Sequence, residues 1–154
     1  MENASARNLW GDFLDAHLEF ASLPAPKVIH LYDNQTDADA AVDLICRETK
    51  RARTRSLKGI QLRHEKLPQI GDFYVVTDWQ GKARAVIRTT SVKLIPYFAV
   101  RDDHARLEGD GDKSLSHWKK IHWEYLEREL SAFGAQPSES MIMVFEAFEL
   151  HFKN

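Results

Sequence analysis

A short acidic turn followed at once by a long amphipathic helix is the feature of this sequence that most constrains its fold. Residues 108–112 alternate three carboxylates with two glycines, and glycine adopts backbone angles that other residues avoid. The turn therefore brings its carboxylates close to a ligand or to a neighbouring strand. Apolar residues then recur at three- and four-residue steps over 115–133, which predicts a helix with one buried stripe. This helix carries two tryptophans and two histidines, among them Trp118 and His122, and that excess over packing needs indicates a site.

The ends of two helices are marked by residues that bind free backbone groups. Ser114 or Ser116 accepts a hydrogen bond from the first turn of the long helix, and Gly134 supplies its stop. Thr36 with Asp39 three residues later resembles a capping box for an earlier helix. These residues predict where the helices begin and end.

Length and composition predict one domain, residues 1–154, with a helical extension over 1–26 and a core over 28–152. The only cysteine, Cys46, makes no internal disulfide, and no apolar run approaches the length of a membrane span. We therefore expect a cytoplasmic protein without a membrane partner. The oligomeric state is left open.

Positive charge is concentrated in residues 47–66, which hold eight Lys or Arg against two Glu. This segment carries +6 in a chain of net charge −2, so the remainder carries −8. Such a cluster either holds phosphate or another anion, or forms a solvated loop that balances acidic neighbours in space. The charge pattern alone leaves both interpretations open.

Strand and helix patterns together predict an α+β domain with a curved sheet or small barrel wrapped by about three helices. Strands are expected over 27–32, 51–56, 72–79, 83–95 and 141–152, and helices over 5–21, 36–48, 99–107 and 115–133. Regular strand–helix alternation, Gly-rich phosphate motifs and clustered metal-binding patterns are absent. His117 and His122 are five residues apart, which places their rings on different helical faces, so we expect no metal and no cofactor.

Two sequence blocks resemble the ASCH domain family, in its longer bacterial type. Residues 48–53, ETKRAR, stand where the family has a Gly-x-Lys-x-Ala-Thr motif, and residues 108–122 match its acidic turn and Trp-containing helix. The strands between these blocks and a final Glu-x-Phe at residues 146–148 extend the similarity over most of 28–152. The resemblance implies a PUA-like small mixed β-barrel flanked by helices. It also implies a nucleic-acid or nucleotide ligand.

The same resemblance suggests catalytic residues. Family members that hydrolyse N4-acetylcytidine have a proposed trio of Lys, Thr and Glu, which by position falls on Lys50, Arg53 and Glu108. Arg53 replaces the threonine, and neighbouring side chains of an extended strand point to opposite faces, so Thr54 is not expected to substitute for it. With the hydroxyl missing, we expect weak or no hydrolysis.

The function predicted from these observations is RNA or nucleotide binding, with the ligand held between residues 47–66 and 108–112. The alternative is a small hydrolase, an N4-acetylcytidine amidohydrolase or a ribonuclease, that uses Lys50 and Glu108. A protein-interaction domain, in which Lys50 and Glu108 form only a structural ion pair, is a third interpretation. The candidate ligand-binding residues are Lys50, Arg51, Arg53, Thr54, Arg55, Glu108, Asp110, Trp118 and His122.

Three further aromatic residues permit two interpretations each. Trp123 lies off the main stripe of its helix, Trp79 lies beside a hairpin turn, and Tyr97 follows a strand end. Each either stacks against an unpaired base or packs beneath a loop. Packing is the commoner outcome for such residues.

Overall fold

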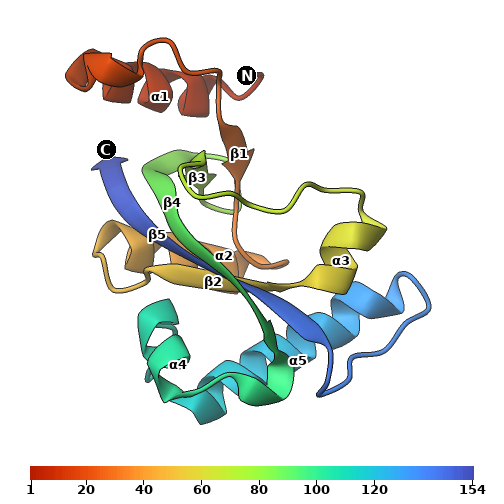
Figure 1. The fold of residues 1–154 in the computed structure, drawn as a ribbon. Helices are drawn as coiled ribbons and strands as arrows, with labels where there is room; N and C mark the ends of the chain where they lie inside the picture. Colours follow the sequence, from red (N-terminus) through yellow and green to blue (C-terminus); the bar gives the residue numbers. More distant parts are fainter.

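The computed structural model describes residues 1–154 and shows one curled five-stranded sheet with helices against it (Figure 1). Two 3-10 turns, η1 (Leu18–Phe20) and η2 (Tyr97–Ala99), join the longer elements. The strands are β1 (Lys27–Ile29), β2 (Ala52–Ser56), β3 (Phe73–Thr77), β4 (Ala83–Pro96) and β5 (Ile142–Lys153). The helices are α1 (Ala4–Ala16), α2 (Gln35–Cys46), α3 (Leu57–Leu62), α4 (Asp102–Glu108) and α5 (Leu115–Ser131).

The sheet is a half-barrel whose two edge strands do not pair with each other. Its order is β1-β3-β4-β5-β2, with β1 parallel to β3 and every other pair antiparallel. The ladder between the long strands β4 and β5 shifts register twice, at Val86/Ile87 and at Thr89/Ser91. Such irregularities bend and twist a strand, so they curl the sheet. The expected α+β, PUA-like architecture is confirmed in this form.

Three apolar clusters hold the helices against the sheet. Helix α1 packs Phe13 and Trp10 against β3 and β4, while α2 buries Ile45 against Val76 and its neighbours. Helix α5 contributes Trp118 to a third cluster that joins it to α4 and β5. Figure 1 shows α1 over the end of the sheet where the chain terminates and α5 at the opposite end. No helix combines the length and apolar character needed to cross a membrane.

Several element boundaries differ from the expected ones for local reasons. The first helix ends at Ala16 and continues only as η1. Strand β1 ends at Ile29, and the chain then turns through Tyr32, whose φ is 63°. Asn34, and not Thr36, caps α2, because its side chain accepts a hydrogen bond from the Asp37 amide. Helix α3 was not expected at all.

The start of α5 agrees with the sequence. Ser114 caps the helix by accepting a hydrogen bond from the His117 amide at 3.0 Å. The helix ends at Ser131, three residues before Gly134. The acidic turn therefore leads directly into the helix, as its pattern indicates.

Gly109 determines where the acidic turn lies. It ends α4 with φ 72°, a left-handed conformation, and packs against the backbone of Thr49. A β-carbon at this position would collide with the Thr49 carbonyl oxygen. The backbone amide of Arg51 also donates to the Leu107 carbonyl at 2.9 Å. Together these contacts bring residues 108–112 beside the chain that enters β2.

We expect Gly109→Ala to lower the free energy of unfolding by about 3 kcal/mol, because left-handed strain and a backbone collision add. Gly134→Ala is the matched control: Gly134 has φ 68° but open space around its Cα. Gly134→Ala introduces only the backbone strain, so it should lower the free energy of unfolding by about 1 kcal/mol. Urea denaturation of both variants measures the difference, and equal losses would show that the close approach to Thr49 contributes nothing.

Candidate functional site

The Lys50 ammonium lies buried between two carboxylates of the acidic turn. Its Nζ donates to Asp110 Oδ2 at 2.8 Å and to the Glu108 backbone oxygen at 3.2 Å, and lies 3.5 Å from Glu108 Oε1. The residue is 1% exposed. Three acceptors match the three protons of the ammonium, so Lys50 is fully satisfied without a ligand. The ammonium also occupies the space between the carboxylates that a cation would take.

The charge state of Lys50 follows from these partners. Burial lowers the pKa of Lys50, but the attraction of Asp110 and Glu108 raises it, and the net pKa lies above its ordinary value. Burial likewise raises the pKa of Asp110, while Lys50 lowers it, and the net pKa of this carboxyl is below its usual value. Lys50 is therefore protonated at neutral pH and is a fixed positive charge rather than a base.

The Glu108 carboxylate is the centre of a buried polar network. Its Oε2 accepts hydrogen bonds from Thr54 Oγ1 at 3.1 Å and from the Trp118 indole, and lies 3.5 Å from His122 Nε2. His122 Nδ1 lies 2.9 Å from the Trp118 carbonyl oxygen, which can only accept, so this nitrogen carries a hydrogen. Helices α4 and α5 thus meet at one carboxylate with several donors.

The expectation that Thr54 cannot take the place of the missing threonine is wrong in its geometry, because the Thr54 hydroxyl donates to Glu108. Arg53 points elsewhere: its Nε donates to Glu146 Oε1 at 3.0 Å, and its guanidinium lies 5.2 Å from the centre of the Tyr74 ring. Alternation along β2 is retained, but β2 is an edge strand. Arg53, Thr54 and Arg55 nevertheless all line the same space beside β2.

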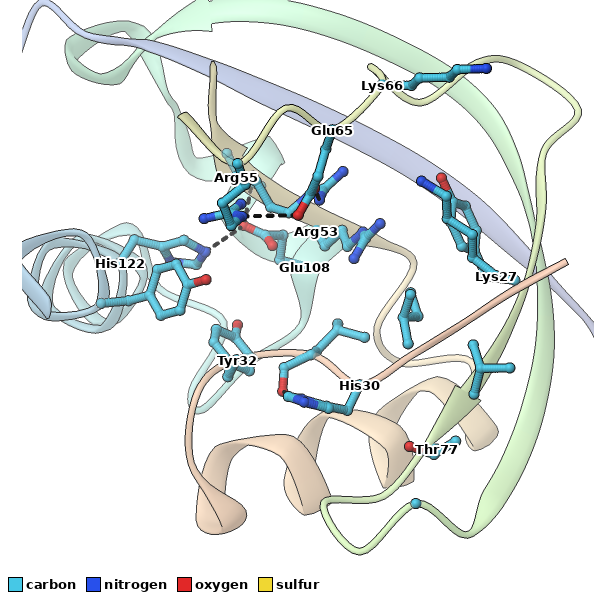
Figure 2. A pocket seen from close by; sticks show the side chains of 18 of the residues that line it. Lys27, His30, Tyr32, Arg53, Arg55, Glu65, Lys66, Thr77, Glu108 and His122 are labelled. Atoms are coloured by element: carbon cyan, nitrogen blue, oxygen red, sulfur yellow. Dashed lines mark hydrogen bonds and ion pairs between the residues drawn. The ribbon is translucent and has the colours of Figure 1, made fainter. Parts of the chain in front are cut away.

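That space is a cavity of about 760 Å³ between the β1 side and the β2 side of the open half-barrel. In Figure 2, His30 and Tyr32 lie across from Arg53, Arg55 and Glu108. Basic side chains outnumber carboxylates in its lining by five to two, although Arg53 and Arg63 also pair with Glu146 and Glu129 behind it. The charged residues of the lining are Lys27, Arg53, Arg55, Arg63, Lys66, Glu65 and Glu108.

The predicted site residues fall into three groups. Those that line the cavity are Arg53, Thr54, Arg55, Glu108 and His122. Lys50, Asp110 and Trp118 lie behind that wall, where each contacts Glu108 or a residue bonded to it. Arg51 is exposed and donates to the Glu48 carbonyl at 2.9 Å, outside the cavity.

Tyr32 is a site residue that the sequence did not reveal. Its hydroxyl donates to Asp110 Oδ2 at 2.6 Å, and Lys50 Nζ lies 5.6 Å from its ring centre. Burial and the nearby Asp110 raise the pKa of Tyr32 well above its ordinary value, so the phenol stays neutral. Its position depends on a left-handed backbone conformation that no sequence pattern marks.

The three aromatic residues singled out from the sequence do not line the cavity. Trp123 packs against Tyr97 with ring centres 5.2 Å apart, and both belong to the cluster beneath α5. Trp79 is 40% exposed and packs edge-on against His30 at 4.9 Å. The packing interpretation is therefore confirmed for Trp123 and Tyr97.

The lowered pKa of Asp110 predicts an acid-sensitive contribution to stability. That contribution is present above the unfolded carboxyl pKa of about 4 and is lost as the pH falls through the folded pKa. Asp110→Asn should lower the free energy of unfolding at pH 7 by about 2 kcal/mol and flatten its fall in acid. Denaturation between pH 3 and pH 7 measures both effects.

Glu124→Gln is the control, because Glu124 is an exposed carboxylate on α5 that makes no hydrogen bond or ion pair. It should leave the pH dependence unchanged. An Asp110→Asn protein with the full acid dependence of the original would contradict the assignment.

Comparison with known proteins places the chain. The family model of the ASCH domain matches residues 27–151. The crystal structure of an ASCH domain from Lactobacillus crispatus is similar with TM-score 0.90 and 30% identity, over 96% of this chain and 94% of that chain. The crystal structure of a protein from Enterococcus faecalis is similar with TM-score 0.86 and 27% identity, over 96% of this chain and 90% of that chain. An ASCH protein from Zymomonas mobilis shares the fold alone. Its TM-score is 0.52 and its identity 11%, over 82% of this chain and 68% of that chain.

No curated protein matches the chain. The residues matched by the family model include the whole polar network, from Tyr32 through Lys50 and Thr54 to Glu108 and His122. Only α1 and η1 precede them. With a family match over most of its length and a 30%-identical structure that aligns nearly end to end, this chain belongs to the ASCH domain family.

Proposed function

We propose that the cavity between β1 and β2 binds a nucleotide unit of single-stranded RNA or a free nucleotide. The observation that carries this proposal is the cavity's lining, in which basic side chains stand beside tyrosines and a buried carboxylate. Its volume of about 760 Å³ lies within the range of small-molecule sites. Membership of the ASCH family, whose members are usually RNA-binding or hydrolase-like, agrees with it.

Two arginines are positioned to hold a phosphate. Arg55 Nη1 donates to Glu65 Oε2 at 2.9 Å, and Arg63 Nε donates to Glu65 Oε1 at 2.9 Å. Arg63 Nη1 also bonds Glu129 Oε2 at 2.7 Å. The shared carboxylate fixes both guanidinium groups while leaving N–H donors free, and guanidinium geometry suits phosphate oxygens.

Two tyrosines of the cavity lining suit a base. Tyr32 and Tyr125 line the cavity with ring centres 6.3 Å apart and nearly perpendicular planes, and unpaired bases stack on aromatic faces. A base at this end of the cavity would lie beside the Thr54 hydroxyl and the buried Glu108 carboxylate to which that hydroxyl donates. A base bound here gives the Glu108 carboxylate a role in a cavity whose lining holds more basic than acidic side chains.

Arg55→Ala should weaken binding of a fluorescein-labelled RNA decamer of random sequence by about tenfold, because one phosphate contact is lost. The slope of log K against log salt should fall by about 0.7, the value for one contact to a single strand. Fluorescence anisotropy at several salt concentrations measures both quantities.

Arg51→Ala is the matched control, since Arg51 belongs to the same basic segment but lies outside the cavity. It should leave affinity and slope nearly unchanged. Equal losses in the two variants would show that the segment attracts RNA only by its overall charge, and would contradict the proposed site.

A second candidate function is hydrolysis of an acyl group on a modified nucleoside. The Thr54 hydroxyl, bonded to Glu108 at the cavity wall, favours it, because Glu108 can take the proton of this hydroxyl or of a water beside it. Lys50 is a fixed cation that forms an ion pair with Glu108, and it does not act as the base. Arg53, which pairs with Glu146, has no part in this arrangement.

Acetate release from N4-acetylcytidine tests this second candidate. If the reaction occurs, Thr54→Val should reduce turnover at least a hundredfold, within the range for a lost proton-transfer group. Thr89→Val is the control, because its equally buried hydroxyl bonds Glu146 at 2.6 Å and does not line the cavity. No release by the unaltered protein, or equal effects of both variants, would eliminate the hydrolase.

A further inference from the structure

A second cavity of about 570 Å³ adjoins the first. Residues 23–27 form one wall, and residues from the loop before β3 form the other. The two cavities share three lining residues, Lys27, Lys66 and Tyr74, and therefore lie side by side. Figure 2 shows Lys27 and Lys66 at the end of the first cavity away from His122.

The junction between the cavities is positively charged. Lys27 and Lys66 are both exposed, and neither makes an ion pair with a carboxylate. The arginines of the first cavity, in contrast, all bond carboxylates. Two ammonium groups that no protein carboxylate neutralises are available to an anion at the junction.

The second cavity has a mixed lining of apolar and polar residues. Leu23 and Leu67 are 40% and 44% exposed, and Pro24 and Pro26 add apolar surface to the same lining. The one carboxylate in its lining, Asp72, accepts a hydrogen bond from the Gln69 amide at 2.9 Å. An uncharged, flat ring system fits such a surface, whereas a second anion has no cation there beyond the two lysines.

We propose that the two cavities form one groove for at least two consecutive nucleotides of single-stranded RNA. The first base lies toward Tyr32 and Glu108, the linking phosphate lies between Lys27 and Lys66, and the second base lies on Leu23 and Leu67. The order of surfaces, aromatic and polar, then cationic, then apolar, repeats the order of base, phosphate and base along a strand. A duplex does not fit, because its bases stay stacked inside the helix.

This inference rests on the proposed function, and a competition series separates the two. The full-length chain is bound to the labelled random decamer, which is displaced by a pool of ribonucleoside 5′-monophosphates or by a pool of 5′-phosphorylated ribodinucleotides. The dinucleotide pool should displace the decamer at about tenfold lower concentration, since it adds one phosphate contact and one base contact.

Leu67→Asp places a negative charge in the second cavity. It should weaken dinucleotide displacement about tenfold and leave mononucleotide displacement unchanged. Ile70→Asp is the matched control, because Ile70 is 72% exposed in the same loop and lines neither cavity. Circular dichroism spectra confirm that both variants fold.

Each outcome has a defined meaning. Dinucleotides that bind no tighter than mononucleotides would overturn the second subsite while leaving the first in place. Equal losses in Leu67→Asp and Ile70→Asp would also overturn it, because the effect would then be general repulsion. Failure of the decamer to bind at all would overturn RNA binding, and with it the two-nucleotide groove, while binding of free mononucleotides would still be tested directly.

Discussion

The ion cluster of Lys50 with Glu108 and Asp110 is the interaction on which the site depends. Removing these charges from water is costly, and only complete pairing and hydrogen bonding offset that cost. The cluster is completely paired because it joins three distant segments: the chain entering β2, the acidic turn after α4, and Tyr32 beyond β1. Breaking the cluster would therefore displace all three segments around the cavity and would not merely remove one contact.

The unclosed sheet explains why a cavity exists beside that cluster. A closed barrel of this size fills its interior with side chains, whereas here β1 and β2 stay apart and the space between them remains open. Arg53 and Thr54, consecutive residues of the edge strand β2, both line it. A second cavity, lined in part by Leu67, lies beside the first and shares Tyr74 with it.

Sequence patterns predicted the elements well because each rests on local chemistry. The acidic turn, the Ser114 cap and the long α5 stripe are all read within a few residues, and the family resemblance paired Lys50 with Glu108. The failures were of another kind. The alternation rule gives the face of a strand that a side chain occupies and not its tertiary neighbours, so it placed Thr54 away from Glu108. The position of Tyr32 depends on a backbone conformation set by tertiary contacts. The second cavity joins segments with no shared motif.

The central claim, that the ligand reaches the Glu108 end of the cavity, is tested most directly through Trp118. Its indole N–H donates to Glu108 but does not line the cavity, so its NMR resonance reports on that carboxylate. Titration with ribonucleoside 5′-monophosphates should shift the Trp118 indole signal, assigned with Trp118→Phe, and leave that of Trp10, buried against β3 and β4, unchanged. Saturable binding with an unmoved Trp118 signal would contradict the account.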